Sequence, residues 1–293
     1  MGHVLYDTDS CLVKQSYSPR MMATFLNLAG FGMVAWDPCS VRAEDPFSYR
    51  ATSLPAFDRN LRALAAKLAP TCLVAHVRGV TNSEHEMVAE TNLHPFRFHG
   101  TRVALAHNGH LREFARMRYD LVEHIRPDLA QRISGTTDSE WIYALVLSQL
   151  EDPGGMPETR ELADAAAAAL RILRDVRGHH GIDTSSPVNL FLATGTSLVV
   201  TRFSFDYGWY PDEDHLLETD LPYCSLWYTV GGEYVPQDGG SAMTASDGSR
   251  SLLIASEPLT LDTSTWLEVP EYSMITATVG PGGLDHETRD LDV

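Results

Sequence analysis

Two short apolar runs in the first half of the chain end in side chains that could bind a substrate. Cys72–Ala75 is closely followed by Arg78, and Val103–Ala106 is closely followed by Asn108 and Gly109. An arginine can hold a carboxylate through two parallel hydrogen bonds. An asparagine amide beside the backbone N–H of a glycine supplies two convergent donors for an oxyanion. Together these residues predict acyl transfer from a small substrate that carries a carboxylate.

The elements that position these residues are two predicted strands. Each apolar run has the length of a buried strand and turn residues at its end. Polar groups at strand ends are presented to a cleft by a rigid sheet. Both features also have a purely structural interpretation, since Asn-Gly is a favoured hairpin turn and Arg78 could be an ordinary strand-end arginine. An amphipathic helix over Asp58–Ala69, capped by Asp58, precedes the first strand.

A third polar residue lies at the predicted start of a helix. Thr137 and Glu140 have the spacing of a capping box, and apolar residues then recur at helical spacing up to Leu150. Asp138 therefore falls in the first turn. It could simply interact favourably with the helix dipole, or it could receive a substrate ammonium group.

The rest of the chain adds helices and then strands. Leu111–Ile133 is helical in period with an interruption at Pro127, and Glu161–Arg177 is a second amphipathic helix. Gly195 marks a hairpin. Apolar strands are predicted at Leu190–Ala193, Leu198–Phe203, Leu226–Val230, Leu252–Ala255 and Met274–Val279. This order predicts an α+β fold in which two packed, mostly antiparallel sheets are flanked by helices.

Composition excludes several classes of protein. The 293 residues include 22 Lys plus Arg against 39 Asp plus Glu, a net charge of −17, which argues against a nucleic-acid partner. No apolar run reaches the length of a membrane span, so no membrane association is expected. The four cysteines form no CxxC pair and indicate reduced thiols in a cytoplasmic protein.

Cofactor and metal motifs are incomplete. His85-Glu86 begins like a zinc-protease motif, but Ala89 stands where the second histidine belongs. Gly30-Phe31-Gly32 lacks the frame of a dinucleotide fingerprint and fits packing glycines in a strand. We therefore expect neither a cofactor nor a metal.

Four short motifs make a specific resemblance, and they occur in a characteristic order: AHVRGVT at 75–81, HPF at 94–96, AHNG at 106–109 and TTDSE at 136–140. In this order they resemble a class II glutamine amidotransferase of the N-terminal-nucleophile (Ntn) hydrolase superfamily. QSYSPR at 15–20, GFG at 30–32 and SLLIASEPL at 251–259 extend the resemblance to small stand-alone members, similar to those of ergothioneine biosynthesis and glutathione breakdown. The resemblance covers nearly the whole chain and implies one domain over residues 1–293.

The resemblance implies a fold and a set of roles. The fold would be a four-layer αββα sandwich. Arg78 would bind the α-carboxylate of glutamine, and Asp138 its α-ammonium. Asn108 and the Gly109 N–H would form the oxyanion hole. The remaining pocket residues would be Thr81, His94 and His107.

The sequence departs from the family at its beginning. The family nucleophile is a cysteine that becomes residue one after the initiator methionine is removed, with its α-amine as general base. Here Gly2 follows Met1. We therefore expect the strand that carries this cysteine to be absent or shortened, with His3–Tyr6 as its remnant and the native start roughly a dozen residues upstream. Cys11 is a poor substitute, because an internal thiol lacks the α-amine.

The activity implied is cleavage of glutamine or another γ-glutamyl amide, although the chain as written should be inactive. The alternative is a catalytically silent protein that binds γ-glutamyl ligands or serves as a partner subunit. A metal-dependent hydrolase would need a convergent His/Asp/Glu set that the sequence lacks. Whether ammonia passes to a partner synthase, whether a peptidase subunit binds, and whether the chain forms a homo-oligomer stay open.

Overall fold

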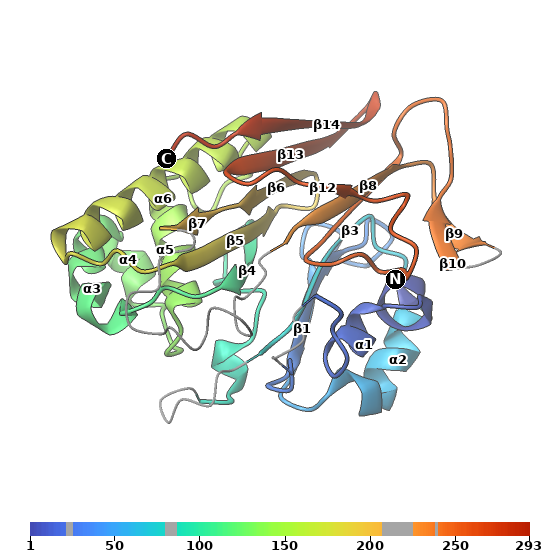
Figure 1. Cartoon of the computed structure of the whole chain (residues 1–293), viewed down its shortest axis with the longest axis horizontal. Helices are drawn as coiled ribbons and strands as arrows, with labels where there is room; N and C mark the ends of the chain where they lie inside the picture. The colour runs from blue at the N-terminus through green and yellow to red at the C-terminus, as the bar shows by residue number, and fades with distance from the viewer. Residues whose placement is uncertain (22–25, 80–86, 207–224, 238–239) are drawn as a thin grey trace.

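The computed structural model describes residues 1–293 except 22–25, 80–86, 207–224 and 238–239 (Figure 1). The helices are η1 (His3–Asp7), α1 (Leu12–Gln15), η2 (Pro55–Phe57), α2 (Arg59–Ala65), η3 (Glu90–Asn92), α3 (Phe114–Leu121), η4 (Val122–His124), α4 (Pro127–Ala130), α5 (Asp138–Ser148) and α6 (Thr159–His179). The strands are β1 (Phe31–Trp36), β2 (Phe47–Ala51), β3 (Cys72–Val77), β4 (Ala104–Gly109), β5 (Ser186–Ala193), β6 (Ser197–Arg202), β7 (Ser204–Phe205), β8 (Trp227–Gly231), β9 (Tyr234–Gln237), β10 (Gly240–Met243), β11 (Ser251–Ala255), β12 (Leu267–Glu268), β13 (Ser273–Gly280) and β14 (Gly283–Asp290).

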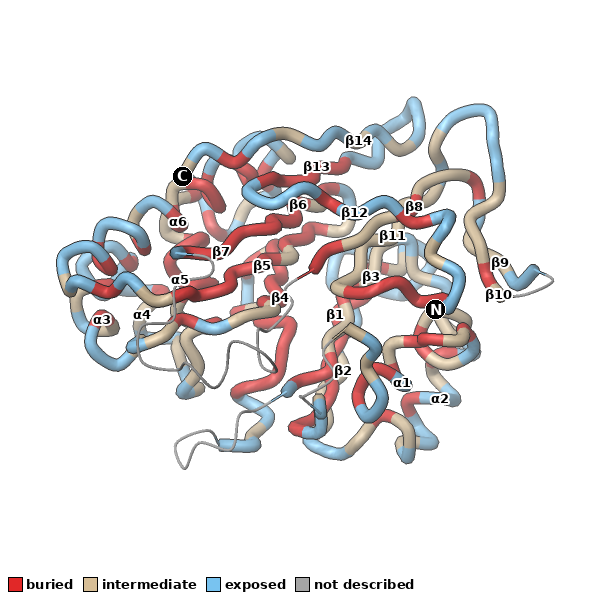
Figure 2. Tube along the Cα trace, viewed as in Figure 1, coloured by how far each residue is buried: buried red, intermediate tan, exposed pale blue. Residues whose placement is uncertain are grey.

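The largest sheet follows the order β14-β13-β6-β5-β4, with β7 paired to β5, and its paired strands are antiparallel. Side chains alternate between its faces. Val103 and Leu105 join the largest apolar cluster with α5 and α6, which cover that face (Figure 1). Ala104 and Ala106 face the other way and pack against Val74 of β3. Strand β4, which carries Asn108 and Gly109, is thus buried on both faces over most of its length (Figure 2).

Two smaller antiparallel sheets lie against that second face, with strand orders β2-β1-β3 and β11-β8-β12. Strand β1 shows why its sequence suits this position. Phe31 and Met33 pack with Leu61 of α2, whereas Val34 and Trp36 pack with the large sheet. The expected mixture of helices with several antiparallel sheets is confirmed.

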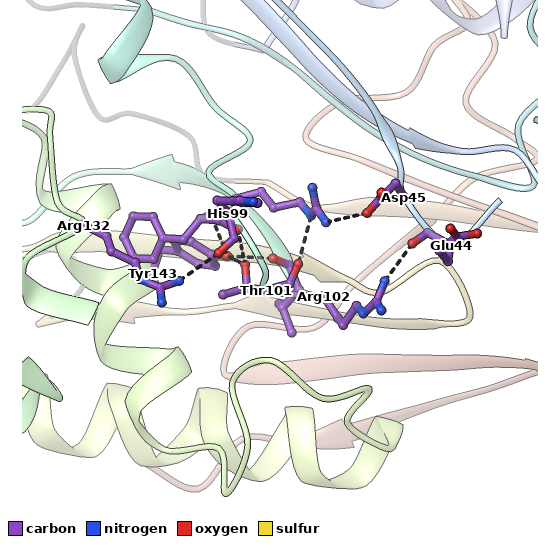
Figure 3. Close-up of polar contacts among 10 residues, drawn as sticks. Glu44, Asp45, His99, Thr101, Arg102, Arg132 and Tyr143 are labelled. Carbon is purple, nitrogen blue, oxygen red and sulfur yellow. Dashed lines mark hydrogen bonds and ion pairs between the residues drawn. The ribbon is translucent and has the colours of Figure 1, made fainter. Parts of the chain in front are cut away.

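A hydrogen-bonded clamp fixes residues 99–103, the short stretch just before β4. Tyr143 Oη of α5 donates to the Val103 carbonyl at 2.7 Å and lies 2.8 Å from Thr101 Oγ1. Arg132 donates to the His99 carbonyl and Arg102 to the Glu44 carbonyl (Figure 3). This clamp anchors the segment that follows His94.

Most predicted elements are confirmed. Asp58 caps α2, since its Oδ1 accepts from the N–H groups of Asn60 and Leu61. Gly195, with φ of 96°, lies in the turn between β5 and β6 as expected. The helix expected at Glu161–Arg177 is α6. Among the described residues, no helix combines the length and the apolarity that a membrane crossing needs.

Two local predictions were wrong. His3–Tyr6 is not a remnant strand, because His3–Asp7 forms a single π-helical turn that buries Leu5. Thr137 makes no side-chain cap, and the Glu140 carboxylate instead accepts from the backbone N–H groups of Ser134 and Gly135. The loop before α5 folds back over the start of the helix. Its Ser134 and Gly135 N–H groups, and not the Thr137 N–H of a capping box, are therefore the donors to Glu140.

Candidate functional site

The ends of β3 and β4 bring the first predicted residues together. Arg78 directly follows β3, and its backbone N–H bonds to the Gly30 carbonyl at 2.9 Å. Its side chain is buried, with 6% exposed, and donates to the Met87 carbonyl at 3.2 Å. A buried guanidinium held in this way is a fixed positive charge at a strand end, which is the arrangement expected for binding a carboxylate.

Three histidine rings lie close together near this charge, and this group is called the histidine stack below. The ring centroids of His76 and His94 are 4.4 Å apart, and those of His94 and His107 are 6.5 Å apart. Burial lowers the pKa of His76 to about 3 and lowers the pKa of His94 well below its ordinary value, and the neighbouring charge of Arg78 lowers both further. The stack is therefore neutral at pH 7. No group of three or more His, Cys, Asp and Glu side chains within the described segments is arranged to hold a metal ion.

Asp138, the first residue of α5, reaches the same histidines through His107. Its Oδ2 accepts from the backbone N–H of Leu111 at 2.5 Å, and its Oδ1 accepts from the Ser139 hydroxyl at 3.1 Å. The Ser139 oxygen also lies 2.9 Å from His107 Nδ1. Because the Asp138 charge also raises the pKa of His107, partly opposing burial, this carboxylate is electrostatically linked to the stack.

Asn108 and Gly109 end β4 as predicted. The Asn108 amide donates to the hydroxyl of Ser256, the residue after β11, at 3.0 Å. Gly109 has φ of 142°, and a Cβ there would lie 1.9 Å from the Pro187 carbonyl oxygen. Only glycine fits this backbone position, so the sequence at the end of β4 is dictated by local geometry as well as by chemistry.

An apolar cavity of about 210 Å³ adjoins Asn108 and Ser256. Residues 73–77 of β3 and 252–255 of β11 form two of its walls. Each of these strands is the end strand of its sheet, and Figure 2 draws them side by side. The cavity therefore separates two strand edges of the second sheet layer, directly beside the amide of Asn108.

The described cysteines are poorly placed for chemistry at this site. Burial raises the pKa of the Cys11 thiol, and it raises the pKa of Cys72 to about 11. A buried neutral thiol is a weak nucleophile. Cys72 is the first residue of β3 and pairs with Trp36, the last residue of β1, so it lies at the end of β3 far from Arg78. Cys39 is exposed and follows β1 by three residues, at this same far end. Cys224 lies outside the described residues.

The structure therefore groups most of the predicted residues. It brings Arg78, His94, His107 and Asp138 around one histidine stack, with Asn108 and Gly109 at the adjoining strand end. Thr81 lies outside the described residues. Sequence reasoning missed His76, although its position two residues before Arg78 was visible. It also missed Ser139, for which neighbouring Asp138 was the only signal.

The site thus combines two antiparallel sheet layers with a buried cation and amide donors at strand ends and a carboxylate at the start of α5. The family model for class II glutamine amidotransferases matches residues 5–282. The chain belongs to the class II glutamine amidotransferases.

Individual relatives agree. The chain is 27% identical to a probable glutamine amidotransferase, DUG3, of Saccharomyces cerevisiae (strain ATCC 204508 / S288c), over 94% of this chain and 77% of the yeast protein. A class II domain protein from Silicibacter pomeroyi has a similar structure, with a TM-score of 0.56 at 22% identity over 90% of this chain and 92% of that one. The glutamine phosphoribosylpyrophosphate amidotransferase of B. subtilis has a TM-score of 0.50 at 17% identity, over 90% of this chain and 44% of the B. subtilis chain. At these identities, the two structures show that the fold is shared.

Proposed function

We propose that this protein cleaves glutamine or another γ-glutamyl amide, releasing glutamate together with ammonia or an amine. The observation that carries the proposal is the pairing of Arg78 and Asp138 around one neutral histidine stack. A buried cation and a fixed carboxylate match the α-carboxylate and α-ammonium of an amino acid. A substrate held in this way would extend its side-chain amide toward Asn108.

The reaction is an acyl transfer through a cysteine. The thiolate attacks the amide carbon, and the negative charge that develops on the amide oxygen is stabilised by the Asn108 side chain and the Gly109 N–H. The α-amine of that cysteine takes the thiol proton before the attack and, in its protonated form, gives it to the leaving nitrogen as the C–N bond breaks. Water hydrolyses the resulting thioester, which releases glutamate and regenerates the thiol.

The cavity between β3 and β11 supports a location for that cysteine. His76 near the end of β3 lies against His107, and Ser256 follows β11, so both strands run toward Asn108. An intervening strand that starts beside Asn108 would run antiparallel to both. Its side chains would contact the cavity residues Leu73 and Ile254. We propose that a strand joined upstream of Met1 fills this place and presents an N-terminal cysteine beside the Asn108 amide.

Such a strand would join the two smaller sheets into one. The order would become β2-β1-β3, the added strand, then β11-β8-β12, and this layer would lie between the large sheet and the helices α1 and α2. We accordingly propose the four-layer αββα sandwich as a single domain over residues 1–293. We also propose that the protein is located in the cytoplasm. Its partner would be a synthase that uses the released ammonia or a peptidase subunit that binds beside the site.

The test compares two forms of the protein. One is the 293-residue chain, and the other carries an N-terminal Met-Cys extension of roughly a dozen residues with an apolar strand pattern. The extended form should release ammonia from L-glutamine or an amine from a γ-glutamyl amide, whereas the short form should not. Replacement of the added cysteine by alanine should abolish release without changing the thermal midpoint.

A covalent glutamine analogue identifies the nucleophile directly. Mass spectrometry should find the label on the added cysteine alone, with Cys11, Cys39, Cys72 and Cys224 unmodified. Label on Cys11 of the short form, or turnover by that form, would overturn the proposal for the nucleophile. Binding of L-glutamine without turnover by any extended form would favour the alternative, a catalytically silent γ-glutamyl-binding protein.

A further inference from the structure

A continuous polar chain connects β4 to the start of α5. His107 Nδ1 lies 2.9 Å from the Ser139 hydroxyl oxygen, and that oxygen lies 3.1 Å from Asp138 Oδ1. His107 and Ser139 are 1% and 3% exposed. A buried hydroxyl placed between a ring nitrogen and a carboxylate has to satisfy both neighbours with one proton and its lone pairs.

The direction of the hydrogen bonds follows from this inventory. A carboxylate only accepts, so the single Ser139 proton is donated to Asp138. The Ser139 oxygen must then accept from His107, because two lone pairs at 2.9 Å would repel one another. Burial lowers the pKa of His107 below its ordinary value, so the ring is neutral and carries one proton. Its Nδ1 contact with Ser139 at 2.9 Å is shorter than the 3.4 Å contact of Nε2 with the Pro187 carbonyl, which favours Nδ1 as the protonated nitrogen. The chain therefore runs from His107 to Ser139 to Asp138.

The second oxygen of Asp138 is held differently. Oδ2 accepts from the Leu111 backbone N–H at 2.5 Å, a donor fixed by the end of the β4 segment. Two donors from separate elements therefore set the plane of the carboxylate. Removing the Ser139 hydroxyl would leave one of them, and the carboxylate could rotate about that remaining bond.

We propose that Ser139 is a positioning residue, which, with its hydroxyl oriented by His107, holds Asp138 in the conformation that receives the α-ammonium of the substrate. The inference rests on the proposed function, since it assumes an amino-acid ligand at Asp138. It assigns recognition of the ammonium group to a three-residue unit and not to the carboxylate alone.

The experiment measures binding to the 293-residue chain by calorimetry with two ligands, L-glutamate and glutarate, which lacks the α-amino group. Ser139→Ala should weaken L-glutamate binding roughly tenfold and leave glutarate binding unchanged, because only the first ligand needs an oriented Asp138. Ser139→Thr, which keeps a hydroxyl, should restore most of the affinity. Ser148→Ala, on the same helix with its hydroxyl bonded to Ala144, is the matched control and should bind both ligands normally.

A double-mutant cycle separates positioning from general loosening. His107→Phe should weaken L-glutamate binding in the same direction, and adding Ser139→Ala should cost little more, since both changes break the same chain. Equal weakening of both ligands by Ser139→Ala, or additive effects in the cycle, would overturn the inference. Asp138→Asn distinguishes a failure of the positioning role of Ser139 from a failure of the proposed function. If it weakens L-glutamate binding and Ser139→Ala does not, only the positioning role fails, whereas an unaffected Asp138→Asn contradicts the proposed function.

Discussion

Asn108 and Ser256 are 148 positions apart in the sequence, yet the Asn108 amide donates a 3.0 Å hydrogen bond to the Ser256 hydroxyl. Both residues line the cavity between β3 and β11. The contact joins the end of the large sheet to the end of β11. It also shows that the amide points toward the cavity, where a developing oxyanion would need a donor.

Asn108 should matter for turnover and not for affinity. In the extended form, Asn108→Ala should lower turnover roughly a hundredfold or more while glutamine binding changes little, because the donor acts on charge that develops only in the transition state. Steady-state kinetics provide the measurement. Ser256→Ala leaves the Asn108 amide in place and should keep most of the activity. Wild-type turnover by Asn108→Ala would reduce Asn108 to a structural turn residue.

Gly109 should tolerate no side chain. With φ of 142° and a Cβ position 1.9 Å from the Pro187 oxygen, Gly109→Ala should lower the free energy of unfolding by about 1–3 kcal/mol or more. Gly178, in α6, has open space around its Cβ position, so Gly178→Ala should raise stability by about 0.5–1 kcal/mol. Urea denaturation of both variants measures the difference. Equal stability of the two would refute the steric argument.

Stability should fall in acid because of the histidine stack. Burial lowers the pKa of His76 to about 3, whereas an unfolded histidine titrates near 6.5. Between these values the unfolded chain binds a proton that the folded chain does not. The free energy of unfolding is therefore highest above pH 6.5. It falls as the pH drops toward 3, by up to about 1.4 kcal/mol per pH unit for each such histidine.

Denaturation midpoints at pH 7, 6 and 5 check this expectation. His76→Phe removes one titrating group and should make the pH dependence of stability shallower, even if its absolute stability changes. His99→Gln alters an exposed histidine and should leave the slope as it is. An identical slope in His76→Phe and the wild type would show that the acid sensitivity comes from other groups.

The residues at strand ends could be predicted because their signals are local. An apolar run that ends in Arg78, and another that ends in Asn108-Gly109, fix both the strand and the side chain it presents. The hydroxyl of Ser139 could not be assigned in this way. Its role depends on a histidine 32 positions away, a contact that no periodicity encodes.

Predictions failed where another hydrogen-bond donor lay nearby, or where exposure to solvent removed the apolar residues that indicate a strand. Glu140 has capping-box spacing to Thr137, but the folded-back loop supplies the Ser134 and Gly135 N–H groups instead. Strand β14 was not predicted at all. As the end strand of the large sheet it is mostly exposed, so its sequence GLDHETRD carries no apolar run to indicate a strand.

The central claim is that Arg78 and Asp138 are the two poles of an amino-acid site. Calorimetric titration of the 293-residue chain with L-glutamate tests it most directly, with Arg78→Ala and Asp138→Ala beside the wild type and circular dichroism to verify folding. Each substitution should weaken binding roughly tenfold or more, since each removes a charge-assisted hydrogen bond worth about 1.5–3 kcal/mol. Arg78→Lys should recover only part of the affinity, because lysine lacks the planar fork. Unchanged binding of L-glutamate by both alanine variants would contradict the account.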